Sequence, residues 1–79
     1  MSDLKVTLAD LWRELLKIEE VTEDTDFFDA GGTSIVAVYL AAEIQERFGA
    51  AVDAVDVVTY PRFADLSGLV EEKLAGTAL

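Results

Sequence analysis

The apolar residues near the start of the chain recur with a helical period. Between Thr7 and Lys17 they are spaced at i, i+3, i+4, i+7 and i+8, which places them on one face of a helix. Thr7 is a residue type that caps helix N-termini, and Asp10 follows near the positive end of the helix dipole. We therefore predict a first amphipathic helix over Thr7–Lys17. Its core stripe comprises Leu8, Leu11, Trp12, Leu15 and Leu16.

A second helix is predicted over Ser34–Phe48, followed by Gly49, a residue suited to ending a helix. The first half of this helix, Ile35–Ala42, is apolar on every side, whereas the second half is amphipathic. A chain of 79 residues can hardly bury one helix on all sides. We therefore predict an exposed apolar strip close to Ser34.

Two further patterns complete an all-α prediction. Asp53–Thr59 is rich in valine, but no partner strand exists for it, so we predict a short irregular helix that ends before Pro61. Phe63–Leu74 shows a helical period again, and Gly76 follows it. The predicted fold is a small four-helix bundle with three main helices, a short third helix and a long loop between the first two. The last helix has a core stripe of Phe63, Leu66, Leu69, Val70 and Leu74.

That long loop, Glu19–Thr33, is polar and acidic and contains Phe27 and Phe28. Irregular connections of this length in compact domains tend to be functional. We expect the two phenylalanines to pin the loop to the helices. The loop ends in Asp29-Ala30-Gly31-Gly32, a tight turn in which glycine permits positive φ.

Length and composition limit the class of protein. The chain suits one domain over residues 1–79, with an ordered core at about 5–75. It contains no Cys, so no disulfide or thiolate metal site is expected. No signal peptide or membrane span is visible, which favours a cytoplasmic monomer away from membranes. Met1 and the short tail after Leu74 indicate a free-standing protein, although an excised domain would look similar.

The net charge of −10 is unevenly distributed, because the segment from Ile18 to Glu46 contains acids and no base. Phosphate binding needs Lys and Arg, so nucleic acid is not expected as a partner. A basic protein surface fits this segment, although acidity that serves solubility alone would look the same. The eight acids are Glu19, Glu20, Glu23, Asp24, Asp26, Asp29, Glu43 and Glu46.

Enzyme and metal chemistry find little support. The absence of His and Cys excludes the Ser-His-Asp and Cys-His arrangements. Carboxylate-based glycoside hydrolysis would need a cleft that so short a chain is not expected to form. Asp24, Asp26 and Asp29 resemble the start of a calcium loop, but Phe28 falls on the fifth position, which requires an oxygen ligand. We therefore expect no catalytic residue and no metal site.

The turn Gly31-Gly32-Thr33-Ser34 stands at a helix N-terminus, where backbone N–H groups favour an anion. It lacks the lysine of a nucleotide-binding P-loop, and a plain helix cap explains these residues equally well. The longer string Asp26–Ile35, however, resembles the modification site of carrier proteins, above all the peptidyl carrier domains of nonribosomal peptide synthetases. In that family an "FF..GG.S" string precedes the second helix, and its serine carries 4′-phosphopantetheine.

The resemblance covers nearly the whole chain and includes the order of helices and the passage Val57–Leu66 into the last helix. It implies that Ser34 holds the covalent 4′-phosphopantetheine and that Gly32 and Thr33 lie beside it. Thr33 departs from the His or Asp usual before the serine in peptidyl carriers, and Arg62 replaces a frequent Thr. The departure at Thr33 leaves an acyl carrier of a polyketide-type pathway as an alternative.

The role implied by the resemblance is a carrier and not an enzyme. A phosphopantetheinyl transferase would modify Ser34, an adenylation or other loading enzyme would attach an aminoacyl, peptidyl or acyl group as a thioester, and condensing or tailoring enzymes would use it. Ile35, Val38 and Tyr39 are the predicted docking strip for these partners. The remaining alternative is an acidic helical interaction module that is never modified.

Overall fold

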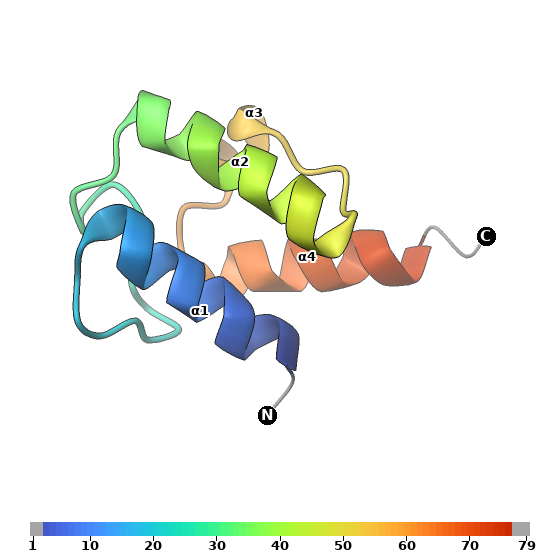
Figure 1. Cartoon of the computed structure of the whole chain (residues 1–79), viewed down its shortest axis with the longest axis horizontal. Helices are drawn as coiled ribbons and strands as arrows, with labels where there is room; N and C mark the ends of the chain where they lie inside the picture. Colours follow the sequence, from blue (N-terminus) through green and yellow to red (C-terminus); the bar gives the residue numbers. More distant parts are fainter. Residues whose placement is uncertain (1–2, 77–79) are drawn as a thin grey trace.

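The computed structural model describes residues 3–76, which form four α-helices (Figure 1). They are α1 (Asp3–Leu16), α2 (Ser34–Phe48), α3 (Ala54–Thr59) and α4 (Phe63–Gly76). Across these residues the β-type pairing is limited to one isolated antiparallel bridge between Asp26 and Arg62. The all-α bundle with a short third helix is therefore confirmed. The ends of the predicted domain, residues 1–2 and 77–79, lie outside the described part.

The core is organised around Trp12, which is fully buried. Its ring meets Phe27 edge-on at 5.4 Å and Phe63 edge-on at 5.1 Å, measured between ring centroids. Edge-to-face pairs of this kind contribute about 0.5–1.5 kcal/mol each beyond the apolar area that they bury. Because Phe27 belongs to the long loop and Phe63 to α4, these contacts fasten the loop to two helices. The expectation that Phe27 pins the loop is confirmed.

The first helix differs from its predicted bounds. It begins at Asp3 and not at Thr7, so the prediction of Thr7 as its N-cap is wrong. Leu4 lies one turn before Leu8 and packs half-buried on the core, which extends the apolar stripe upstream. The helix ends at Leu16, and Lys17 adopts φ 57°, the left-handed conformation that commonly follows a helix.

The third helix is regular where an irregular one was expected. Asp53 is its N-cap and accepts hydrogen bonds from the backbone N–H of Val55 and Asp56, while the Asp56 carboxylate accepts one from the Asp53 N–H. This reciprocal capping stabilises a helix too short to persist alone. The pattern was missed because its second member is Asp in place of the usual Glu or Gln.

The ends of the two long helices give mixed outcomes. Gly49 closes α2 with φ 73°, as predicted. The last helix, in contrast, continues through Gly76, so Leu74 is not the end of α4. Leu74 is 36% exposed and lies at the edge of the core, which corrects its place in the core stripe. Between residues 3 and 76, no helix is long and apolar enough to cross a membrane.

Candidate functional site

The turn that precedes α2 is built by backbone and carboxylate hydrogen bonds. The Asp26 carboxylate accepts hydrogen bonds from the N–H groups of Phe28 at 2.9 Å and Asp29 at 3.0 Å. The Asp26 carbonyl accepts a third from the Ala30 N–H at 2.9 Å. Gly31 follows at φ 107°, a conformation that side chains oppose. The chain is thereby turned sharply toward the start of α2.

Gly32 is fixed by its contact with Phe27. Its N–H donates to the Phe27 carbonyl at 2.9 Å. A Cβ atom at this position would stand 2.4 Å from the Phe27 ring and 2.6 Å from the Phe27 carbonyl oxygen, closer than real Cβ contacts. Glycine is therefore required here by space, because the turn lies directly against a buried aromatic ring. The predicted site residue Gly32 positions the serine from below the turn.

Thr33 is the N-cap of α2, with extended backbone angles of φ −124° and ψ 173°. Its hydroxyl accepts a hydrogen bond from the Val36 N–H at 3.3 Å. Ser34 comes next as the first helical residue, and it is exposed. Its hydroxyl forms no hydrogen bond with any residue from 3 to 76, so it is available to another molecule.

The surroundings of Ser34 favour a negative charge there. The first turn of α2 contains no acidic residue, whereas the other three helices have Asp3, Asp56 and Asp65 in their first turns. An anion near a helix N-terminus is stabilised by about 0.3–1 kcal/mol when the site is exposed. A phosphate ester on Ser34 would thus meet helix N–H groups without a carboxylate in the same turn.

The long loop is tied to the α3–α4 connection by backbone hydrogen bonds. The Phe27 N–H donates to the Pro61 carbonyl at 2.8 Å, and the Phe63 N–H donates to the Thr25 carbonyl at 2.9 Å. These contacts join segments separated by more than thirty positions in sequence, as the residue numbers show. The position of Ser34 therefore depends on the start of α4 as well as on its own helix.

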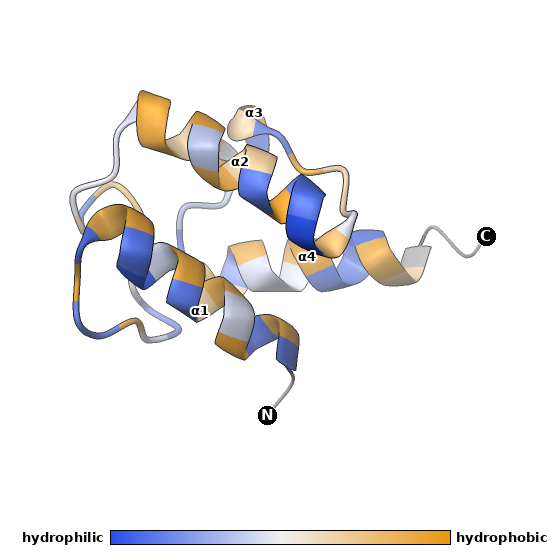
Figure 2. Ribbon diagram, in the orientation of Figure 1, coloured by the Kyte–Doolittle hydropathy of each residue, from blue (hydrophilic) through white to orange (hydrophobic). Residues whose placement is uncertain are grey.

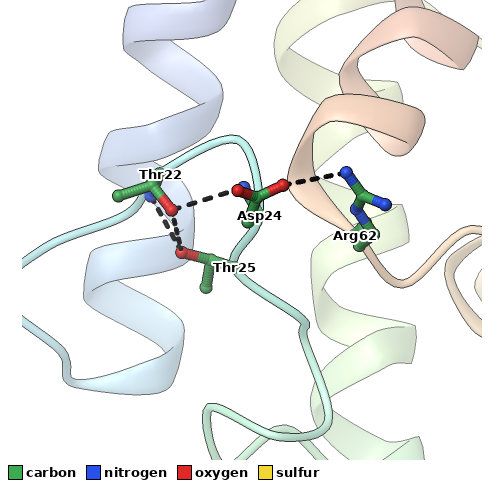
Figure 3. A network of polar contacts seen from close by, with 4 residues as sticks. All are labelled: Thr22, Asp24, Thr25 and Arg62. Atoms are coloured by element: carbon green, nitrogen blue, oxygen red, sulfur yellow. Dashed lines mark hydrogen bonds and ion pairs between the residues drawn. The ribbon is translucent and has the colours of Figure 1, made fainter.

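Side chains reinforce the same junction (Figure 3). Arg62, at the start of α4, donates to the Asp24 carboxylate at 2.8 Å, and the Thr22 and Thr25 side chains meet on the loop side. This exposed ion pair is worth about 0–1 kcal/mol, so it aligns the loop more than it stabilises it. Arg62, noted as a departure from the family pattern, thus has a partner on the functional loop.

The apolar strip predicted near Ser34 is exposed. Ile35 is 70%, Val38 57% and Tyr39 61% exposed, and hydrophobic residues occupy the start of α2 in Figure 2. The opposite side of α2 is buried through Ala37, Leu40, Ala41 and Ile44.

Two exposed apolar side chains on the neighbouring helix α3 were missed. Val55 is 69% and Val58 56% exposed, while Val57 between them is fully buried. The spacing of the exposed pair, i and i+3 around one inward residue, was the available signal. It was obscured because the segment also fitted a strand.

A bundle with an unpartnered serine at a helix start and an exposed apolar strip beside it defines a carrier domain. The family described as "Phosphopantetheine attachment site" matches residues 6–70, and the chain belongs to this family. Proteins of the family carry covalent 4′-phosphopantetheine. The function of the chain is therefore that of a carrier related to those of natural-product biosynthesis.

Relatives come from two kinds of synthetase. The chain is 38% identical over 77 residues to the bassianolide nonribosomal cyclodepsipeptide synthetase of Beauveria bassiana, covering 95% of this chain and 2% of that protein. It is 31% identical over 78 residues to a phenolphthiocerol/phthiocerol polyketide synthase of Mycobacterium tuberculosis, covering 99% of this chain and 5% of that protein. The chain thus spans a small fraction of these relatives.

A solved structure agrees with the fold. The HMG-ACPI domain from the CurA module of Lyngbya majuscula superposes with a TM-score of 0.84 at 29% identity. The superposition covers 98% of this chain and 80% of that domain. The residues present also fit the cofactor of the family, because the exposed Ser34 hydroxyl has no competing partner within residues 3–76 and the adjoining helix turn accepts an anion.

Proposed function

We propose that the Ser34 hydroxyl is the atom that carries 4′-phosphopantetheine, and that residues 1–79 act as one carrier domain without catalytic activity of their own. The observation that carries the proposal is the exposed, unpartnered Ser34 at the capped start of α2. In the modification, the Ser34 oxygen forms a bond to the β-phosphorus of coenzyme A and the pyrophosphate bond breaks. Adenosine 3′,5′-bisphosphate leaves, and the hydroxyl proton passes to a base of the transferase.

The attached arm ends in a thiol, which supplies a thioester for cargo that this Cys-free chain could not otherwise form. The residues of the chain hold and present the arm. Thr33 keeps the helix start ordered, Gly32 lets the turn lie on Phe27, and Ser34 faces solvent so that the arm can reach several enzymes. Tethering raises the local concentration of cargo at each of them.

We infer an aminoacyl or peptidyl cargo from the glycine pair Gly31-Gly32 and from relatives that include a nonribosomal synthetase. The polyketide synthase relative keeps an acyl cargo as the second candidate. Loading the modified chain with an amino acid by an adenylation enzyme, followed by intact-mass measurement, tests the first. Loading only by an acyltransferase supports the second.

The proposed partners are a phosphopantetheinyl transferase, a loading enzyme and condensing or tailoring enzymes in the cytoplasm. They would dock on an apolar surface formed by Ile35, Val38 and Tyr39 of α2 with Val55 and Val58 of α3. The acid-rich, base-free segment from Ile18 to Glu46 suits basic partner surfaces, because complementary charge speeds encounter.

The direct test is intact-protein mass spectrometry after incubation with coenzyme A, Mg²⁺ and a broad-specificity transferase. We expect the parent chain to gain one phosphopantetheine mass and Ser34→Ala to gain none. Thr33→Ala is the control, because it keeps the Ser34 hydroxyl and loses only a cap worth about 1 kcal/mol. A mass gain on Ser34→Ala, or none on folded parent protein with several transferases, would overturn the assignment and favour an unmodified interaction module.

Replacing Ile35 by glutamate is expected to slow modification without unfolding the domain. The side chain is 70% exposed, so the core loses little, but a docking contact of about 1.5 kcal/mol disappears. We expect kcat/KM of the transferase to fall about tenfold or more. Ala51→Glu, an exposed site beyond the other end of α2, adds the same charge and should leave the rate unchanged. Equal slowing of both variants would contradict a docking role.

A further inference from the structure

A second apolar hollow lies away from the strip beside Ser34. It has a volume of about 430 Å³ and is formed where the long loop returns alongside α1 (Figure 1). Its apolar lining comes from α1, the loop and the start of α4, and none of these residues belongs to the proposed docking surface for the carrier's enzymes. They are Val6, Ala9, Val21 and Phe63.

The hollow is open to an occupant because its apolar residues are incompletely covered. Val6 is 43% exposed, and Ala9 and Val21 are half-buried, whereas Phe63 forms a buried floor. A concave apolar surface of a few hundred Å³ with a small number of polar groups at its rim is typical of a binding site. Its size suits one large aliphatic or aromatic side chain with its neighbours.

Charge distinguishes this hollow from two others on the surface. Its rim carries two bases, Lys5 and Arg13, against a single acid, Glu23. The hollow beside α4 has only the acids Asp65 and Glu72 at its rim, and the one between α1 and α2 has two acids and one base. In a chain with net charge −10, a rim with an excess of bases selects an acidic partner.

The two bases have exchangeable partners. Lys5 donates to the Glu23 carboxylate at 3.0 Å, and this hydrogen bond raises the pKa of Lys5. Arg13 pairs with Asp10 on the same helix. All four side chains are at least one-third exposed, and such surface pairs contribute about 0–1 kcal/mol. An incoming carboxylate can therefore replace either acid at little cost.

We propose that this groove, defined by Lys5, Val6, Ala9, Arg13 and Val21, docks an acidic amphipathic helical segment of a partner protein. An apolar side chain of the segment fills the hollow, and its flanking carboxylates meet Lys5 and Arg13. The groove and the strip beside Ser34 thus select partners of opposite charge, so a carrier engaged by a basic enzyme stays able to hold an acidic segment on α1.

The test uses the ¹⁵N-labelled full chain and a synthetic helical peptide with leucines on one face and glutamates on the other. We expect saturable NMR shift changes centred on Val6, Ala9 and Val21, and none there with a peptide in which lysines replace the glutamates. The Ser34→Ala chain should bind equally well, so this result is independent of the proposed modification. Changes elsewhere, or none, would overturn the proposal.

Variants separate the groove from overall charge. The double reversal Lys5→Glu with Arg13→Glu should raise the Kd of the peptide about tenfold or more. Arg47→Glu with Lys73→Glu makes the same change in net charge outside the groove and should alter the Kd by less than about twofold. Val6→Asp, which keeps both bases and changes an exposed side chain, should also weaken binding. Equal effects of the two double reversals would show net charge alone and refute the groove.

Discussion

Replacing Phe27 by alanine is expected to remove about 3–5 kcal/mol from the free energy of unfolding. Phe27 is fully buried and packs edge-on against Trp12, and Gly32 lies directly on its ring. At about 0.05–0.15 kcal/mol per residue, a domain of this size has a total stability of about 4–12 kcal/mol. The variant therefore loses a large share of its stability, and the turn before Ser34 loses its support.

Urea denaturation followed by circular dichroism measures this change through the midpoint at a constant slope. Phe28→Ala is the matched control, because the adjacent ring is only half-buried and should cost clearly less. Modification of Ser34 should decline in step with the folded fraction of Phe27→Ala. If Phe27→Ala and Phe28→Ala were equally stable, Phe27 would not be the anchor of the loop.

The second large effect is expected for Gly32→Ala. The added methyl would stand 2.4 Å from the Phe27 ring and 2.6 Å from its carbonyl oxygen, so either the ring or the turn must move. Overpacking of this kind costs about 1–3 kcal/mol. Because the turn leads straight into Thr33 and Ser34, we also expect slower modification of the fraction that remains folded.

Gly68→Ala provides a control with the opposite sign. Gly68 lies inside α4, and a Cβ there would meet nothing within 4 Å. Removing a helical glycine should raise stability by about 0.5–1 kcal/mol and leave modification unchanged. Thermal unfolding of the two variants beside the parent decides the matter. A Gly32→Ala protein as stable as Gly68→Ala would mean that the turn does not press on Phe27.

The sequence predicted those features that depend on local pattern. Ser34–Phe48 and its Gly49 end were correct because apolar spacing and a C-terminal glycine are both written locally. The first helix was placed too late because Thr7 resembles a cap, while the half-buried packing of Leu4 extends the helix and is a tertiary effect. The exposure of Tyr39, also compatible with a core position, could be decided only by the placement of the other helices.

The site shows the same division. The motif around Ser34 and the exposed strip on α2 followed from residue types. The clash that makes Gly32 necessary, the hydrogen bonds that join Phe27 to Pro61 and Phe63 to Thr25, and the exposed valines of α3 did not. Each of these depends on segments that meet only after the loop has packed against α4. Periodicity within one segment holds no information about such meetings.

The packing of Trp12 gives the domain an internal optical probe. It is the one tryptophan of the chain, and its ring lies between Phe27 of the long loop and Phe63 of α4. Its emission wavelength will shift to the red whenever water reaches the indole, which happens if the loop lifts from the bundle. Fluorescence of unlabelled protein can therefore follow the loop beside Ser34 in real time, including during an encounter with an enzyme that contains no tryptophan.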